Sequence, residues 1–348
     1  MTDLISQLDE QKRKVAFDTY DITVQQLITM FREGAIDVAP VYQRQYRWDT
    51  GRQSRLIESI FLGIPVPSLF MAANTDGTWE LVDGVQRLLT LIHFAADDDV
   101  REKASLHEPL RLGSLEKLSE LNNLKYSELP RSVQLQFMLR PIKVITLNDK
   151  SDMVVRFDLF ERLNTGGVAL TYQEIRSCIY RGEFDFFLER LSEYDPFRTV
   201  VRLPASAEKD GTRQEYVLRF FAFFQQYQDF KHSVLDFLNE YMGSASKAFD
   251  YASNEKLFRR TFDALAKALP KGLSRRTNRT TPVNLYEAVA VGAALALEQN
   301  GRIRTAGIDR WLNSEDLRSL TTGATNSPRM VTGRIEFCRN KFGWTREK

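Results

Sequence analysis

The chain has 348 residues, with 48 Lys and Arg against 46 Asp and Glu; 43% of its residues are hydrophobic and 27% are charged. This composition is typical of soluble globular proteins, and it excludes intrinsic disorder, collagen-like repeats and a fibrous architecture. At roughly 150 residues per domain, the length indicates about two domains.

The first 170 residues mix helical and strand patterns. Apolar residues at 24, 27, 28 and 31, and again at 56, 57, 60 and 61, have the spacing of amphipathic helices. The Gly and Pro residues of 63–67 end the second helix, and two strands are expected at 68–73 and 79–83, joined by a turn. Another helix starts at Val85, the charged stretch 97–129 indicates an insertion or a helical linker, and 141–147 predicts a further strand.

Beyond about residue 150 the periodicity is almost entirely helical. Thr171 and Glu174 have the spacing of a capping box, and the Phe-rich segments 184–194 and 216–230 are expected to be packing faces. The predicted class is therefore α+β. A small α/β head, residues 1–170, is followed by a mainly helical domain, residues 171–348, that is basic towards its C-terminus.

Cysteines and apolar runs indicate the compartment. Cys178 and Cys338 are too few for a disulfide scaffold, so we expect thiols. The longest apolar run, 288–297, is far shorter than the roughly 20 residues of a membrane span, and the first residues do not resemble a signal peptide. We expect a cytoplasmic protein with no membrane partner.

Charge is distributed unevenly along the chain. Residues 1–254 hold 30 basic and 37 acidic side chains, whereas residues 255–348 hold 18 basic and 9 acidic ones, a net charge of +9. A basic C-terminal part suits a polyanionic partner. It equally suits a solvated helical surface paired against the acidic part, and composition leaves both open.

The most informative motif is Asp83-Gly84-Val85-Gln86-Arg87, which lies between a predicted strand and a predicted helix. The first turn of a helix exposes N–H groups and a partial positive charge, so Arg87 is mildly unfavourable there unless an anion lies alongside. Gly84 lets a ligand approach the backbone. The motif therefore suits a phosphate. The alternative is a plain turn, with Asp83 as the cap and Arg87 paired to a surface acid.

Two further motifs are weaker by themselves. Residues 42–48, Tyr-Gln-Arg-Gln-Tyr-Arg-Trp, alternate aromatic and basic side chains that could stack a base and hold phosphates, or could form a solvated edge strand. Residues 160–167, Phe-Glu-Arg-Leu-Asn-Thr-Gly-Gly, end an amphipathic helix and could expose amides to an anion, or could simply terminate the helix.

Together with the Ile64-Pro-Val-Pro67 turn, the three motifs resemble, over about residues 20–180, the ParB/sulfiredoxin-like N-terminal domain of GmrSD-type (type IV) restriction systems and related anti-phage defence proteins. The family signature is Asp-Gly-Gln-Gln-Arg, so Val85 replaces one glutamine. The departure bears on the rate of hydrolysis more than on phosphate binding.

The resemblance implies a nucleoside triphosphate, of unknown base, and Mg²⁺ as cofactors of an NTPase head that controls action on DNA. It implies catalytic roles for Asp83, Gln86 and Arg87, with Asp83 also as the metal ligand. The implied nucleotide contacts are Gln43, Arg44, Tyr46, Trp48, Gly84, Arg162, Asn164, Thr165 and Gly166.

Many members of this family continue into an HNH nuclease, which needs clustered histidines. This chain has only His93, His107 and His232, and His93 is expected to be a satisfied, partly buried side chain. No Walker A motif and no Cys-x-x-Cys pair occur in the sequence. The acidic run 97–99 is expected to be solvated rather than a metal site.

The loop 270–282 is basic and contains no acid, which makes it the best candidate for contact with the DNA backbone, against the alternative of a plain surface loop. Its candidate DNA-binding residues are Lys271, Arg275, Arg276 and Arg279.

Three functions remain open from sequence. The first is an NTP-hydrolysing regulator that acts on DNA with a separate nuclease or effector. The second is a non-catalytic DNA- or protein-binding module with a degenerate pocket. The third is a metal-dependent nuclease with Asp83, Glu80 and Glu161 as ligands. A homo-oligomer is compatible with each of them.

Overall fold

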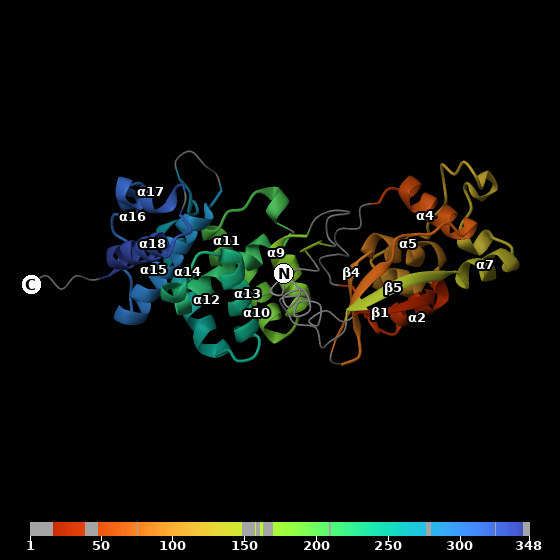
Figure 1. Cartoon of the computed structure of the whole chain (residues 1–348). Coiled ribbons are helices and arrows are strands. Elements are labelled where there is room, and N and C mark those ends of the chain that lie inside the picture. Colours follow the sequence, from red (N-terminus) through yellow and green to blue (C-terminus); the bar gives the residue numbers. More distant parts are fainter. Residues whose placement is uncertain are drawn as a thin grey trace, which may run out of the picture. The chain divides into compact units, whose positions relative to one another are not determined.

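The computed structural model describes residues 17–38, 48–74, 76–147, 157, 161–162, 170–208, 210–275, 280–323 and 325–343. The chain divides into two compact units, Met1–Ala169 and Leu170–Lys348, called the head and the body below (Figure 1). The head combines strands and helices, and the described part of the body is helical, so the predicted α+β class is confirmed.

The head is built on a five-stranded mixed sheet of order β1-β5-β3-β4-β2. Its strands are β1 (Phe17–Thr23), β2 (Ile36–Asp37), β3 (Leu69–Ala73), β4 (Trp79–Asp83) and β5 (Pro141–Leu147). β5 runs antiparallel to β1 and parallel to β3, while β4 runs antiparallel to β3 and parallel to β2. Leu69, Leu81 and Val144 are fully buried between this sheet and the helices. The strands predicted at 68–73, 79–83 and 141–147 are confirmed.

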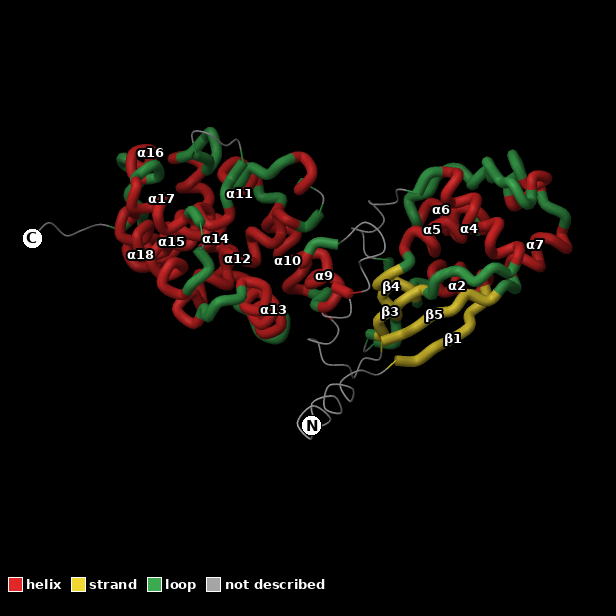
Figure 2. The backbone as a smooth tube through the Cα atoms, turned by 45° about the horizontal axis from the view of Figure 1, so that its top comes forward, coloured by secondary structure: helices red, strands yellow, loops and turns green. Residues whose placement is uncertain are grey.

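Helices lie on one side of the head and strands β1, β3, β4 and β5 on the other (Figure 2). The helices are α2 (Val24–Arg32), α4 (Thr50–Leu62), α5 (Val85–Ala95), α6 (Asp98–Lys103) and α7 (Arg131–Met138), with 3₁₀ turns η1 (Ser119–Leu121) and η2 (Tyr126–Glu128). Asp49 caps α4 by accepting the Arg52 N–H at 2.8 Å, and Gly63 ends it with a φ of +70°. The helices predicted around residues 24–31 and 56–61 and from Val85 are confirmed as α2, α4 and α5.

The charged stretch 97–129 is a packed part of the head rather than a helical linker. Its one α-helix is α6, and much of the remainder is irregular chain with four buried leucines, Leu106, Leu110, Leu112 and Leu115. Backbone N–H groups of this stretch find hydrogen-bond acceptors on α4: Glu58 Oε1 accepts the N–H groups of Lys117 and Leu118 at 3.1 and 2.8 Å. The acidic run 97–99 starts α6, with Asp97 as its cap.

The body packs aromatic side chains between its helices. These are α9 (Tyr172–Ile179), α10 (Glu183–Ser192), α11 (Asp195–Val200), α12 (Thr212–Gln226), α13 (Val234–Ala245), α14 (Tyr251–Ala268), α15 (Val283–Asn300), α16 (Ile308–Trp311), α17 (Glu315–Thr321) and α18 (Pro328–Phe342). The Phe-rich segments are packing faces as predicted, apart from Phe186, which is 52% exposed. The capping box of Thr171 and Glu174 is also present.

The apolar helix α15 belongs to the core of the body. Gly292 lets α18 approach it, since a Cβ there would lie 2.7 Å from the backbone nitrogen of Arg339. Within the described parts of the chain, no helix combines the length and hydropathy that a bilayer crossing requires.

Candidate functional site

The motif 83–87 forms the turn from β4 into α5. Gly84 is the residue before the helix and has a φ of +102°, a backbone conformation that side-chain-bearing residues rarely adopt. A Cβ on Gly84 would lie 2.4 Å from Cδ2 of the buried Leu69 and 3.0 Å from a terminal nitrogen of Arg87. The turn therefore requires glycine both for its conformation and for its space.

Arg87 lies across this turn and is held from two sides. One terminal nitrogen donates to the carboxylate of Asp83 at 2.7 Å and to the backbone carbonyl of Ser68 at 3.0 Å. The side chain of Arg87 is 16% exposed and that of Asp83 is 38% exposed. The Nε of Arg87 is buried and meets no hydrogen-bond partner among the described residues.

This geometry corrects the alternative interpretation of the motif. Asp83 does not cap α5, because the residue at the cap position is Gly84 and no side-chain cap bond forms there among the described residues. Arg87 does pair with a partly exposed acid, as that interpretation expected, and this acid is Asp83 itself, four residues earlier. The start of α5 thus keeps its first N–H groups without a side-chain cap, which is the arrangement that favours an anion.

Gln86 links the turn to Trp48, another of the predicted nucleotide contacts. Its Oε1 accepts the backbone N–H of Trp48 at 3.2 Å, although the two residues are 38 positions apart. The guanidinium of Arg52 lies 5.3 Å from the centre of the Trp48 ring. The structure therefore brings Trp48 beside the turn, as a shared pocket requires.

Val85, the departure from the family signature, is only 9% exposed and belongs to the hydrophobic core. At this position a valine gains burial that a glutamine would need polar partners to match. Val85 therefore packs into the core behind the turn.

Several predicted contacts lie outside the described residues, namely Gln43, Arg44, Tyr46, Asn164, Thr165 and Gly166. Arg162 is described as an exposed helical residue. Among the described residues, no group of three or more His, Cys, Asp or Glu side chains has the arrangement of a metal site.

Sequence analysis did not single out Gln53, which approaches the turn from α4. Its Nε2 donates to the backbone carbonyl of Trp48 at 2.7 Å, and its Oε1 lies 2.8 Å from Nδ1 of His93. The available signal was a polar residue at 53 on the same helical stripe as Leu56, Ile57 and Ile60. His93 is partly buried and hydrogen-bonded, as predicted.

The candidate DNA-binding loop is described only in part, because Arg276 and Arg279 lie outside the described residues. Lys271 is exposed. Arg275 donates to the hydroxyls of Thr321 and Thr322, so it ties the loop to the end of α17. Burial, together with repulsion from Arg318, lowers the pKa of Arg275.

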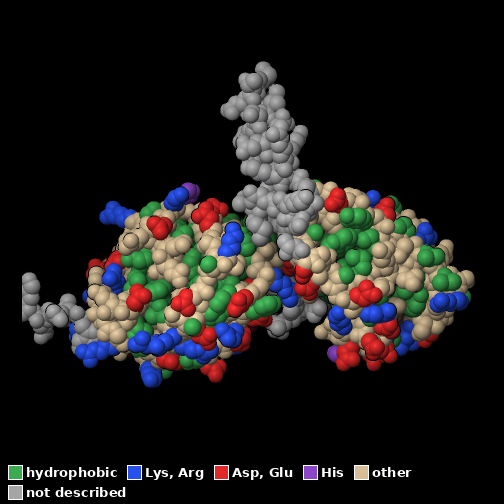
Figure 3. All heavy atoms as spheres, turned by 90° about the horizontal axis from the view of Figure 1, so that it is seen from below, with side chains coloured by type: hydrophobic (Ala, Val, Ile, Leu, Met, Phe, Trp, Pro, Cys, Tyr) green, Lys and Arg blue, Asp and Glu red, His purple; other side chains and the backbone are tan. Residues whose placement is uncertain are grey.

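On the face drawn in Figure 3, basic side chains with some acids among them line one edge of the body.

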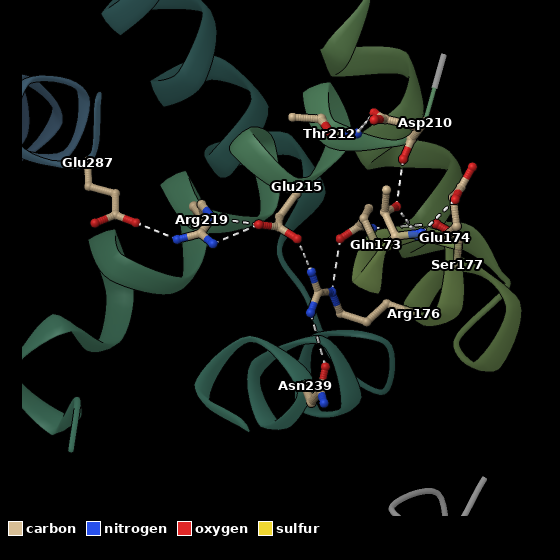
Figure 4. Close-up of polar contacts among 11 residues, drawn as sticks. Gln173, Glu174, Arg176, Ser177, Asp210, Thr212, Glu215, Arg219, Asn239 and Glu287 are labelled. Atoms are coloured by element: carbon tan, nitrogen blue, oxygen red, sulfur yellow. Dashed lines mark hydrogen bonds and ion pairs between the residues drawn. The ribbon is translucent and has the colours of Figure 1, made fainter. Parts of the chain in front are cut away.

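Inside the body, a buried polar network links five charged side chains, and Figure 4 shows four of them, Arg176, Glu215, Arg219 and Glu287. Arg176 of α9 donates to Glu215 of α12, Glu215 also binds Arg219, and Arg219 reaches Glu287 of α15 at 2.7 Å. Glu287 in turn accepts from Arg334 of α18. Burial, opposed mainly by Glu215, lowers the pKa of Arg176 to about 10, so this arginine is charged at neutral pH.

Comparisons with known proteins place the site in a family. Residues 24–181 match the family model described as GmrSD restriction endonuclease, N-terminal domain. Comparisons with curated proteins and with solved structures gave no match. The matched segment starts with α2, contains the 83–87 turn, Trp48 and Gln53, and ends just after α9. Residues 24–181 of this chain are therefore a GmrSD-type N-terminal domain.

Proposed function

We propose that this protein is a nucleotide-binding, NTP-hydrolysing regulator of a DNA restriction system, which acts on DNA together with a separate effector. The restriction context is supported by the family of residues 24–181. The nucleotide role is supported by one observation above all: Arg87 lies in the first turn of α5, whose start has no side-chain cap bond among the described residues, and its guanidinium lies across the glycine turn.

The proposed chemistry uses the groups already at this turn. The N–H groups of the first turn of α5 and the guanidinium of Arg87 would bind the phosphates. Water attacks the terminal phosphorus, the bond from that phosphorus to the bridging oxygen breaks, and a nucleoside diphosphate and inorganic phosphate leave. Positioning and charge stabilisation supply most of the catalysis in such a transfer.

Asp83 and Gln86 have more constrained roles in this proposal. One carboxylate oxygen of Asp83 is bound to Arg87, and the partly exposed carboxylate fits a Mg²⁺ ion that is shared with the phosphates, the usual mode for this ion. When bound, Mg²⁺ would neutralise phosphate charge. Gln86 holds the Trp48 peptide, so any role in orienting water is combined with positioning the pocket.

The remaining parts of the proposal are DNA contact by the body and cleavage by a separate effector. The exposed Lys271 and the tethered Arg275 would contact the DNA backbone, together with Arg276 and Arg279. A separate effector is proposed because the three histidines of the chain lie far apart in sequence and do not form the cluster of an HNH nuclease.

The test measures phosphate release from ATP, GTP, CTP and UTP with Mg²⁺, with and without DNA. We expect release with at least one nucleotide and its loss in Arg87→Ala. Arg140→Ala is the matched control, because Arg140 also donates to a backbone carbonyl, that of Phe61, and also has a buried Nε without a described partner. Full release by Arg87→Ala, or neither release nor binding by the native protein, refutes the proposal.

A further inference from the structure

Glutamine side chains bind both backbone polar groups of Trp48, its N–H and its carbonyl. Its backbone N–H donates to Gln86 Oε1 at 3.2 Å, and its carbonyl accepts from Gln53 Nε2 at 2.7 Å. Gln53 is only 4% exposed, so water cannot readily replace this second bond. Trp48 is itself one of the predicted nucleotide contacts, so the two glutamines hold the backbone of a residue in the proposed pocket.

The orientation of the Gln53 amide depends on His93 of α5. Gln53 Oε1 lies 2.8 Å from His93 Nδ1, and the other ring nitrogen, Nε2, lies 2.6 Å from the backbone carbonyl of Glu108. Both ring nitrogens therefore face oxygen atoms. A carbonyl oxygen only accepts, so each of these contacts requires a proton on the ring.

Counting donors shows that one protonation state satisfies all of these groups. A neutral imidazole carries one N–H and can serve either Glu108 or Gln53, but not both. If the ring serves Glu108, Gln53 must turn its NH₂ group towards Nδ1, and its oxygen then opposes the carbonyl of Trp48. The imidazolium donates to both oxygens and leaves the Gln53 NH₂ group on Trp48.

We propose that Gln53, oriented by His93, is a positioning residue for the Trp48 peptide, and that a proton on His93 strengthens this hold and nucleotide binding with it. The nucleotide part of the inference rests on the proposed function. The coupling from His93 through Gln53 to Trp48 rests on the geometry alone.

The groups that face His93 determine the pH range in which its ring titrates. Burial lowers the pKa of His93, the bond to the Glu108 carbonyl opposes this, and repulsion from Arg101 of α6 adds to the lowering. From α4 the facing group is the neutral amide of Gln53. The transition is therefore expected below the usual value of about 6.5. The hold on Trp48 is strongest below the folded pKa and weakens as the pH rises through it, because the neutral ring then divides its single N–H between Glu108 and Gln53.

The coupling can be measured without any nucleotide. The full chain is labelled with 5-fluorotryptophan, and the ¹⁹F resonance of Trp48, one of four tryptophans, is assigned with Trp48→Phe. We expect this resonance to titrate with a midpoint below pH 6.5, and the titration to disappear in Gln53→Ala and in Gln53→Glu, whose side chain cannot donate to Trp48 when ionised. A Trp48 resonance that is independent of pH, or one that still titrates in both variants, overturns the inference.

Gln134→Ala is the matched control. Gln134 is another amide of the head that donates to two backbone carbonyls, those of Tyr126 and Leu129. Its loss should leave the Trp48 titration unchanged. If Gln134→Ala abolishes the titration as well, the effect is general loosening of the head and the inference is rejected.

Nucleotide affinity is then measured from pH 7.5 to 5.5 with each of the four triphosphates. The native protein should bind about three- to tenfold more tightly at the lower pH, the effect of one hydrogen bond, and Gln53→Ala should show no such gain. Nucleotide binding with a flat Trp48 resonance refutes this inference alone. A titrating Trp48 resonance without nucleotide binding at any pH supports the coupling and refutes the proposed function.

Discussion

Arg87 donates to the carboxylate of Asp83, so the arginine that would bind phosphate already has an anionic partner. Asp83 lies just before the positive end of α5, where a negative charge is favourable, whereas Arg87 lies in the first turn, where a positive charge is not. The pair keeps the turn close to neutral in the absence of a ligand. A bound phosphate would take over Arg87 and leave Asp83 to the metal.

The first prediction concerns Gly84. Gly84→Ala should lower the free energy of unfolding by about 2–4 kcal/mol, because it combines an unfavourable positive φ with a contact against the buried Leu69. The same methyl group would push the Arg87 guanidinium away from its place, so nucleotide binding should weaken beyond the loss of stability. Urea denaturation and nucleotide titration measure the two effects.

Gly77→Ala provides the comparison for Gly84→Ala. Gly77 has a similar positive φ of +85°, but an added Cβ there would meet nothing within 4 Å. It should cost only about 1 kcal/mol and leave nucleotide binding unchanged. Equal effects of the two substitutions would show that backbone strain alone, and not the contact with Leu69 and Arg87, explains the result.

The second prediction concerns Glu287, which lies fully buried between Arg219 and Arg334. Glu287→Leu leaves two buried guanidinium groups without this carboxylate and should destabilise the body by about 3–5 kcal/mol. Adding Arg334→Leu should recover part of the loss. Glu193→Ala, which removes an exposed pair with Arg198, should cost no more than about 1 kcal/mol. Similar midpoints for Glu287→Leu and Glu193→Ala in thermal unfolding would contradict the assigned role of the network.

The third prediction concerns Asp185 of α10, a buried carboxyl group beside the hydroxyl of Ser177. Burial raises its pKa to about 7, while the bond to Ser177 opposes the rise. The folded state therefore binds the proton more tightly than the unfolded state, so this group stabilises the fold below its unfolded pKa of 3.8 and the contribution is lost as the pH rises through about 7.

Asp185→Asn should accordingly become more stable relative to the native protein as the pH rises from about 4 to about 7.5, by about 2 kcal/mol or more. Urea denaturation at several pH values measures this difference. Asp250→Asn should show the opposite trend, because hydrogen bonds from Ser253 lower the pKa of Asp250. A stability difference for Asp185→Asn that does not vary with pH would rule out the raised pKa.

The fourth prediction concerns DNA. Affinity should fall steeply with salt, and Lys271→Ala should reduce the slope of log K against log [salt] by about 1, as expected when one phosphate contact is lost. Lys256→Ala removes an exposed lysine from α14 and serves as the control for net charge. Absence of DNA binding at about 50 mM salt would eliminate the proposed role of the loop.

Local patterns were sufficient to predict much of the head. The strand β4, the glycine turn and α5 follow from a short apolar run, Gly84 and the helical spacing of Val85, Leu88 and Leu89, all of which are buried. The position of Trp48 beside the turn was expected only through the family resemblance, since no local rule relates residues 38 positions apart.

The remaining features depend on distant partners. β1 was not predicted because only Ile22 of its seven residues is buried and the strand is defined by pairing with β5, more than a hundred residues later. The irregular chain after α6 is held by Glu58 and Ser54 of α4, whose roles have no signature in their neighbours. Gln53 was missed for the same reason, because its partners Trp48 and His93 lie on two other segments.

The position of α9 has a consequence for how the protein can be divided or recombined. The family match extends to residue 181, but the boundary between the two units lies at 169 and 170, so α9 belongs to the family by sequence and to the body by packing. A fragment that ends at 181 would carry Arg176 away from Glu215 and Asn239. A different helical body fused after residue 181 would therefore have to bring an acid for Arg176, whereas a fusion at the boundary between 169 and 170 leaves α9 with its own partners.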